Sequence, residues 1–180
     1  MKIISNFVDG KHTNVKPSGF IPLFKPTTGE EYAHVPITTQ LEFEEIIRKM
    51  KFAQKSWAET AITKRSNILF KFKSLIEKDF DNIAKIISEE HGKVFSDAKG
   101  SLQRGLEVVD FACGIPHLLK GNHSINVGTN VDSYDIRQSL GICAGITPFN
   151  FPAMVPMWMF PLSIACGNAF ILKPSEKVPQ

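Results

Sequence analysis

The sequence predicts an α/β protein built around a strand–helix–strand unit of a parallel sheet, and two observations support this class. First, the 35 residues between Arg137 and Lys173 contain no Asp, Glu, Lys or Arg, which is typical of a buried segment. Second, residues 141–147 and 169–172 are short apolar runs that suit strands buried on both faces. The roughly twenty residues between these runs are apolar nearly all round, and Gly167-Asn168 is a suitable helix stop. We therefore expect a right-handed βαβ unit.

A membrane-spanning helix is the main alternative for this uncharged stretch. Four prolines argue against it, because a proline inside a helix removes a hydrogen bond and kinks or breaks the helix. No proline-free apolar segment reaches the ~20 residues that a bilayer crossing needs, so we expect no membrane span. The prolines are Pro148, Pro152, Pro156 and Pro161.

Polar residues follow both predicted strands. Thr147-Pro-Phe-Asn150 comes after the first strand, and Lys173-Pro-Ser-Glu176 comes after the second. The carboxyl ends of parallel strands meet at one edge of a sheet, where such sheets bind their ligands. A carboxylate there can accept hydrogen bonds from two ribose hydroxyls, and an ammonium can donate to the sugar or to a phosphate. These residues favour a nucleotide site, but no Gly-x-Gly-x-x-Gly follows either strand. An ordinary solvated loop pair stays open as the alternative.

The region before residue 125 is predicted to form short strands and then four amphipathic helices. Proline and glycine punctuate residues 1–36, which indicates strands and turns. Thr39-Gln-Leu-Glu42 matches a capping box, so the first helix is expected to begin at Thr39. Apolar residues then recur at helical spacing, and we expect these faces to lie in the core. They are Phe43, Ile46, Ile47, Met50, Ala53 and Trp57 in the first helix, and Ile62, Leu69, Phe72 and Ile76 in the second.

The third and fourth helices are predicted in the same way. Asp81 is the expected cap of the third helix, which ends at Gly92. Ser96 or Asp97 is expected to start the fourth helix, which contains Arg104. The apolar positions are Ile83, Ala84 and Ile87 in the third helix, and Leu102, Leu106, Val109 and Cys113 in the fourth.

Residues 133–139 carry an alternating pattern that predicts a half-exposed strand. Tyr134, Ile136 and Gln138 alternate with Asp135 and Arg137. An exposed strand edge is a natural place for pairing with another chain, and a plain surface hairpin is the open alternative.

Composition favours a cytoplasmic protein that binds no nucleic acid. The chain is 43% hydrophobic and has a formal net charge of +3. Its Lys and Arg residues are scattered among nearly as many acids, without the basic run that nucleic acid would require. The first ten residues lack the apolar core of a signal peptide and the arginines of a transit peptide.

The cysteines and histidines do not suggest a reactive centre. Cys113, Cys143 and Cys166 each lie in apolar sequence without the spacing of a disulfide framework, which predicts buried structural thiols. The five histidines have no ligand-type spacing with acids or cysteines, so we predict no metal site.

Long motifs run through the chain in a fixed order. They are Thr147-Pro-Phe-Asn-Phe-Pro-Ala-Met-Val-Pro-Met-Trp-Met-Phe-Pro, Cys166-Gly-Asn and Lys173-Pro-Ser-Glu-Lys-Val-Pro. From about Val8 onward the chain resembles the aldehyde dehydrogenase superfamily, and within it the CoA-acylating methylmalonate-semialdehyde dehydrogenases. Many other members carry Trp at the position of Phe149 and Lys at that of Met159. Those two positions, with Gln103-Arg-Gly-Leu-Glu-Val-Val-Asp-Phe-Ala-Cys113, indicate the acylating branch.

This resemblance implies a fold and a reaction. The fold is the N-terminal part of the aldehyde dehydrogenase fold, with helices and the first βαβ unit of a parallel Rossmann-like sheet. Residues 1–125 would form strands and the helical part of the NAD-binding domain, 126–140 a strand arm for oligomerisation, and 141–180 the βαβ unit. The reaction is NAD-dependent oxidation of methylmalonate or malonate semialdehyde to propanoyl-CoA or acetyl-CoA in valine or inositol catabolism. CoA is the co-substrate, and the family's usual assembly is a homo-oligomer, a tetramer.

The resemblance also assigns roles to single residues. Asn150 would donate its side-chain amide to the oxyanion that forms when a cysteine thiolate attacks the aldehyde. Its alternative role is that of a turn-forming residue between two prolines. NAD would lie along the three residues before Asn150, its adenosine ribose would be held by a lysine and a glutamate, and a second lysine would flank that pair. These residues are Thr147, Pro148, Phe149, Lys173, Glu176 and Lys177.

Arg104 is the candidate substrate-binding residue. The semialdehydes of this branch keep a carboxylate, and a guanidinium can donate two parallel hydrogen bonds to a carboxylate. Arg104 points off the apolar stripe of its helix. The alternative is a surface partner for Glu107 three residues further on.

None of the three cysteines has the local sequence that surrounds the family's catalytic cysteine. We therefore predict that the 180-residue chain alone forms no covalent intermediate and has no dehydrogenase activity. Two alternatives stay open: a non-catalytic truncated remnant or interaction protein, and a bare adenine-nucleotide-binding module.

Overall fold

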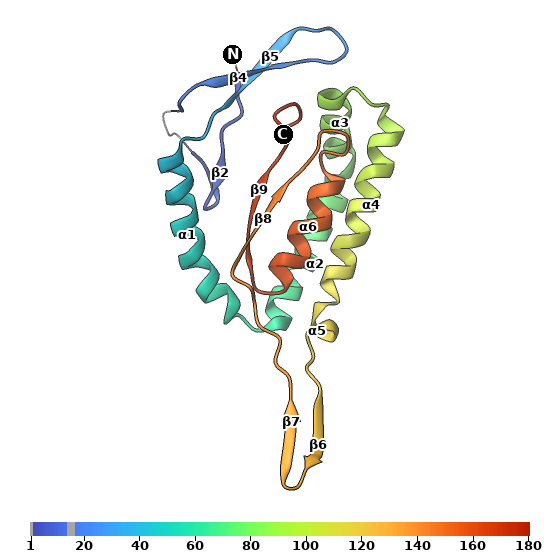
Figure 1. Ribbon diagram of the computed structural model, residues 1–180. Helices are drawn as coiled ribbons and strands as arrows, with labels where there is room; N and C mark the ends of the chain where they lie inside the picture. The colour runs from blue at the N-terminus through green and yellow to red at the C-terminus, as the bar shows by residue number, and fades with distance from the viewer. Residues whose placement is uncertain (1, 14–16) are drawn as a thin grey trace.

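The computed structural model describes residues 2–13 and 17–180 and confirms the predicted α/β class (Figure 1). Its amino-terminal region contains short strands and turns, as expected, although Met1 and residues 14–16 of that prediction lie outside the described residues. One sheet has the order β1-β5-β4, with β1 parallel and β4 antiparallel to β5, and β2 pairs antiparallel with β3. The bounds are β1 (Lys2–Ile3), β2 (Phe7–Val8), β3 (Lys11–His12), β4 (Phe20–Phe24) and β5 (Glu31–Pro36).

Helices occupy the next part of the chain, close to where the periodicity places them. Gly92 ends the third with a φ of 83°, a left-handed conformation that glycine adopts without a Cβ clash. The bounds are α1 (Gln40–Ala58), α2 (Ile62–Lys78), α3 (Phe80–His91), α4 (Phe95–Cys113) and α5 (Ile115–Leu118).

Two of the predicted helix starts are wrong. Asp79 ends α2 and also precedes α3, so a single residue joins the two helices and Asp81 lies inside the first turn of α3. There its carboxylate forms an ion pair of 2.7 Å with Lys99. The fourth helix begins at Phe95, before Ser96 and Asp97, and its preceding residue gives no side-chain cap. Neither helix start has the side-chain cap that was expected.

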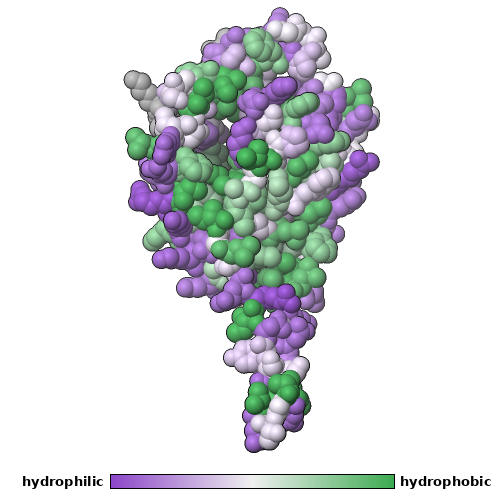
Figure 2. Space-filling model, in the orientation of Figure 1, coloured by the Kyte–Doolittle hydropathy of each residue, from purple (hydrophilic) through white to green (hydrophobic). Residues whose placement is uncertain are grey.

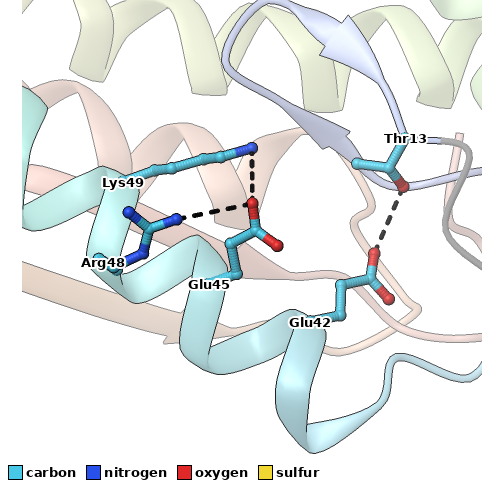
Figure 3. Close-up of polar contacts among 5 residues, drawn as sticks. All are labelled: Thr13, Glu42, Glu45, Arg48 and Lys49. Carbon is cyan, nitrogen blue, oxygen red and sulfur yellow. Dashed lines mark hydrogen bonds and ion pairs between the residues drawn. The ribbon is translucent and has the colours of Figure 1, made fainter.

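Half of the predicted capping box at Thr39 forms. The Thr39 hydroxyl accepts from the backbone N–H of Glu42 at 3.2 Å, as expected. The Glu42 carboxylate turns instead toward the amino-terminal strands, where it accepts from Asn6 at 3.1 Å. It also accepts from the Thr13 hydroxyl at 3.4 Å (Figure 3). Glu42 therefore links α1 to the residues before and after the β2–β3 hairpin.

The core lies where α4 meets α2, α3 and α6 (Met154–Ala165). All four residues of the predicted stripe on α4 are buried, so that prediction is confirmed. Gly105 brings α4 and α6 close together, because a Cβ on it would lie 2.8 Å from the Met157 sulfur and 3.3 Å from the Met154 Cα. The main cluster of buried residues consists of Ile76, Ala84, Ile87, Ala98, Leu102, Leu106, Val109 and Met157.

The predicted βαβ unit is present. β8 (Ile142–Ile146) and β9 (Ala169–Lys173) pair in parallel, and α6 connects them. Helix α6 covers one side of this strand pair, and α1 lies on the other side (Figure 1). The result is a three-layer arrangement in which the strand pair lies between α1 and the packed α2, α3, α4 and α6.

The predicted core face of α1 is largely wrong. Phe43 is 47% exposed, Ala53 is exposed, and the other four predicted residues are half-buried. In the described part of the chain this helix packs on a strand pair, which covers less of its face than a helix layer would. Trp57 still donates from Nε1 to the Ile164 carbonyl at 2.9 Å, which fixes the carboxyl end of α1 to α6.

A β-hairpin of β6 (His123–Gly128) and β7 (Val131–Tyr134) projects from the body (Figure 1). The predicted strand over 133–139 is wrong beyond Tyr134, because Asp135 diverts the chain by bonding to the backbone of Asn122 through its own N–H and carboxylate. The expected half-burial is also wrong, because every residue of both strands is exposed. Figure 2 shows apolar side chains at the far end of this hairpin, where Ile125 and Val131 are 68% and 52% exposed.

Candidate functional site

The structure brings the two predicted polar clusters to one edge of the β8–β9 pair. Ile146 and Lys173 are register partners at the carboxyl ends of the strands. The N–H of Thr147 donates to the Lys173 carbonyl at 3.1 Å, and Thr147 is buried. The residues that follow both strands therefore start side by side, as parallel pairing requires.

Lys173 and Glu176 form an ion pair at this edge. Their charged atoms lie 3.0 Å apart, and the side chains are 59% and 48% exposed. The backbone N–H of Glu176 itself, followed by the Lys173 ammonium, holds the pKa of the Glu176 carboxyl below its ordinary value. An ionised, accessible carboxylate beside an ammonium suits two ribose hydroxyls. The same geometry also fits a solvated loop pair, so the role stays a prediction.

The Phe149 ring contacts Lys177 and His91. The Lys177 ammonium is 4.7 Å from the centroid of its ring, and the His91 ring stacks on it with centroids 6.5 Å apart and an interplanar angle of 27°. Pro148, before it, is exposed. The predicted cofactor residues after β8 thus lie against Lys177 from the loop after β9.

Asn150 is exposed in the irregular segment between β8 and α6. Its carbonyl accepts from the Lys93 ammonium at 2.8 Å. Within residues 2–13 and 17–180, its side-chain amide has no hydrogen-bond partner. The amide can therefore donate to a ligand without first breaking a bond inside the described chain.

Arg104 lies on the exposed side of α4. It forms no ion pair with Glu107 among the described residues, so the alternative of a local surface partner is not realised there. No described contact joins Arg104 to the carboxyl edge, and its role toward a substrate carboxylate stays a prediction.

A pocket of about 540 Å³ adjoins this edge. Its lining includes Phe149, Glu176 and Lys177, but not Thr147, Asn150 or Lys173. The opposite wall comes from β4 and the end of α3, so the amino-terminal sheet reaches the predicted cofactor region. The full lining is Ile21, Pro22, Leu23, Phe24, Pro26, Glu90, His91, Phe149, Glu176, Lys177 and Val178.

Sequence reasoning missed His91 and Lys93, which both contact the loop after β8. Burial, and then the nearby Lys93, lower the pKa of His91, and its Nδ1 is buried without a hydrogen-bond partner in the described chain. Both residues flank Gly92, the predicted helix stop. The signal in the sequence was a basic residue on each side of Gly92. The sequence does not show that this turn contacts the loop after β8.

The prediction of buried thiols is confirmed for Cys113 and wrong for Cys143 and Cys166, which are half-buried. Burial raises the pKa of Cys113 and also that of Cys166, which keeps both in the neutral, weakly nucleophilic form. Cys143 is half-buried in β8. No group of three His, Cys, Asp or Glu side chains that could hold a metal is found over 2–13 and 17–180. Among those same residues, no helix is long and apolar enough to span a membrane.

The fold defines an α/β chain with polar groups gathered at the carboxyl edge of a parallel strand pair. The chain belongs to the aldehyde dehydrogenase family, because the family's sequence profile matches residues 13–180. The resemblance inferred from the motifs is thereby confirmed.

Similar proteins point to one branch of this family. The chain is 47% identical over 98% of its length to the mitochondrial acylating methylmalonate-semialdehyde dehydrogenase of Arabidopsis thaliana, covering 29% of that protein. It is 50% identical over 87% of its length to malonate-semialdehyde dehydrogenase of Pseudomonas aeruginosa, covering 32% of it. A Sinorhizobium meliloti crystal structure assigned as a methylmalonate-semialdehyde dehydrogenase, complexed with NAD, superposes with a TM-score of 0.96 at 45% identity. That match covers 99% of this chain and 36% of the other. The chain spans about a third of the length of the curated relatives it matches.

Proposed function

We propose that this chain contributes the oxyanion amide and part of the NAD site to the NAD-dependent, CoA-acylating oxidation of methylmalonate or malonate semialdehyde. The supporting observation is the parallel pairing of β8 and β9, which brings Thr147, Lys173 and Glu176 to one edge. The names of the similar proteins support the reaction and its substrates. The acylating name of the Arabidopsis relative supports CoA as the co-substrate.

The residues at the edge fit the adenosine ribose of NAD. Glu176 is ionised and accessible, and Lys173 lies within 3.0 Å of it, so acceptor and donor are available together. Thr147, Pro148 and Phe149 would line the cofactor, with Lys177 beside them. NAD, when bound, supplies the acceptor for a hydride. The groups named here would bind and orient it.

Asn150 is the catalytic residue that we propose in this chain. Its amide would donate to the oxygen that becomes negative when a thiolate attacks the aldehyde carbon. A donor in place before the charge develops stabilises the transition state more than the ground state. Arg104 would bind the carboxylate of the semialdehyde.

None of Cys113, Cys143 and Cys166 has the local sequence of the family's catalytic cysteine, and burial also raises the pKa of Cys113 and Cys166. We therefore expect the 180-residue polypeptide alone to form no thioester. The alternative function is a non-catalytic truncated remnant or interaction protein, for which the exposed hairpin offers a surface. For the complete enzyme we propose a homo-oligomer, a tetramer as is usual in the family. Residence in the cytoplasm stays a prediction.

The test uses the native-length protein, which is the polypeptide that an antibody against residues 1–180 captures from its own cells. Its intact mass is compared with the 20.1 kDa of this sequence, and NADH formation is followed with malonate or methylmalonate semialdehyde and CoA. We expect a larger mass and CoA-dependent NADH, while the recombinant 180-residue chain gives neither NADH nor submillimolar NAD or AMP binding. Absence of NADH from the native-length protein would favour the non-catalytic alternative, and turnover by the short chain would refute its predicted inactivity.

A further inference from the structure

The turn between α3 and α4 reaches the loop that carries Asn150. Gly92 ends α3 in the left-handed conformation, and Lys93 follows it directly. The Ser88 hydroxyl donates to the Lys93 carbonyl at 2.7 Å, which fixes the lysine backbone to the last turn of α3. The side chain of Lys93 therefore starts from a rigid part of the helical core.

Lys93 makes two contacts with consecutive residues of that loop. Its ammonium donates to the Asn150 carbonyl at 2.8 Å and lies 4.5 Å from the centroid of the Phe151 ring. The first contact is a charge-assisted hydrogen bond and the second is a cation–π contact. Burial lowers the pKa of Lys93, as expected for an ammonium partly withdrawn from water.

Asn150 depends on contacts of this kind for its position. It is exposed and lies outside any helix or strand, and within the described chain its side-chain amide has no partner. The position from which the amide starts therefore depends on the Asn150 backbone, whose carbonyl is bonded by Lys93.

We propose that Lys93 is a positioning residue, which holds the Asn150 backbone so that the amide is oriented before the substrate arrives. This inference rests on the proposed role of Asn150. A misplacement of about 1 Å in such a site can lower the rate by roughly 10²-fold, so one fixed carbonyl can matter to the reaction. No direct contact of Lys93 with the substrate is required.

The kinetic test uses the native-length protein with Lys93→Met, which removes donor and charge, and Lys93→Arg, which keeps both. Lys85→Met is the matched control, since Lys85 is exposed on α3, the helix that precedes Lys93, and has an ion pair of 3.8 Å with Glu89. We expect kcat to fall about tenfold in Lys93→Met, with little change in KM, and to recover in part in Lys93→Arg. The control should match the wild type.

A double-mutant comparison separates positioning from a general structural effect. If Lys93 acts through Asn150, then Lys93→Met should lower kcat less than about twofold when Asn150→Ala is already present. An undiminished tenfold loss in that background would overturn the proposal, as would an unchanged kcat in Lys93→Met alone.

Backbone order parameters from nuclear magnetic resonance of the 180-residue chain give a readout independent of activity. We expect the order parameters of Phe149, Asn150 and Phe151 to fall from about 0.85 to below about 0.6 in Lys93→Met and to stay unchanged in Lys85→Met, while those of β8 and β9 stay high in both. Unchanged order parameters in the loop would refute the proposal that Lys93 holds Asn150. If the native-length wild type forms no NADH, the proposed function fails, and the order parameters alone decide whether Lys93 fixes the loop.

Discussion

The two ends of the β8–β9 pair use polar side chains in opposite ways. At the amino end, Asn168 is buried, and its Oδ1 accepts from the N–H groups of Leu140 and Gly141 at 2.7 and 2.9 Å. At the carboxyl end, Asn150 is exposed and its amide has no partner in the described chain. The same residue type therefore fixes backbone at one end and remains available to a ligand at the other. Burial together with bonds to backbone identifies the structural asparagine.

Arg65 and Lys173 repeat the contrast. Arg65 is buried, and its guanidinium donates to the carbonyls of Ala165, Ala58 and Thr60, at 2.9, 3.3 and 2.5 Å. Lys173 is 59% exposed, and the side chain of its ion-pair partner Glu176 is 48% exposed. Substitutions at the amino end should therefore lower stability, whereas those at the carboxyl end should lower activity and leave stability unchanged.

The largest effect is expected from Asn150→Ala in the native-length protein. Loss of one oxyanion donor should lower kcat by about 10²- to 10³-fold. The melting temperature should stay within about a degree of the wild type, because no described bond of the side chain is removed. Steady-state kinetics and thermal unfolding measure the two quantities. Asn67→Ala, at an exposed position of α2, is the control. A marked loss of stability in Asn150→Ala would show that Asn150, like Asn168, has a structural role.

Asn168→Ala should have the reverse effect on stability. The substitution leaves the Leu140 and Gly141 N–H groups without their acceptor, at a cost of about 2 to 4 kcal/mol in the free energy of unfolding. Urea unfolding of the 180-residue chain measures it, with Asn82→Ala, whose amide bonds an exposed Asp79, as the matched control. If Asn168→Ala lowers the free energy of unfolding no more than Asn82→Ala does, then Asn168 does not stabilise the amino end of the β8–β9 pair.

Glu176→Gln should weaken NAD binding by about tenfold, because a charged acceptor for ribose hydroxyls is replaced by a neutral one. The pKa of Glu176 is lowered in the folded chain, so its carboxylate stays ionised as pH falls and binding should be level between about pH 5 and pH 8. Titration calorimetry with the native-length protein measures the affinity. Glu89→Gln on α3 should bind NAD normally; equal affinities in the two variants would argue that Lys173 and Glu176 are a solvated pair.

The smallest effect concerns His91, whose folded pKa is lowered by burial. The unfolded chain binds the proton first as pH falls, so stability should decline from about pH 6.5 toward the lower folded pKa. His91→Phe should show a weaker decline between about pH 7.5 and 5.5 in urea unfolding, while His117→Phe, at an exposed site, keeps the wild-type slope. Identical slopes in the wild type and both variants would show that His91 does not cause the loss of stability at low pH.

The sequence predicts this contrast unevenly. The βαβ unit follows from local patterns, because the apolar run at 141–147 and the helix stop at Gly167-Asn168 are both short. The expected burial of both strand faces is wrong, since Ile146 is 79% exposed and Leu172 is 37% exposed. Asn168 was seen as a helix stop, but its bonds to Leu140 and Gly141 depend on a chain reversal of 27 and 28 residues that no local pattern contains. Lys93 was missed for the same reason, since its partner Asn150 lies 57 residues away. The site residues themselves were assigned through family resemblance, and spacing alone left Lys173 and Glu176 undecided.

Two predictions failed because they treated periodicity as burial. The apolar spacing of α1 correctly predicts a helix, but burial requires a neighbour broad enough to cover the face, and β8 and β9 cover only part of it. The alternation at 133–139 likewise predicts an extended chain, but Asp135 bonds to Asn122 and ends the strand at Tyr134. In both cases the outcome depends on tertiary contacts, which the local sequence pattern does not contain.

The guanidinium of Arg65 has a consequence for cooperativity. It bonds carbonyls at the carboxyl ends of both α1 and α6, on opposite sides of the strand pair. Helix α1, whose apolar face is poorly covered, therefore cannot detach without leaving a buried cation short of acceptors. We infer that α1 opens together with α6 as one unit and does not fray independently, so that the outer layer shares the stability of the core.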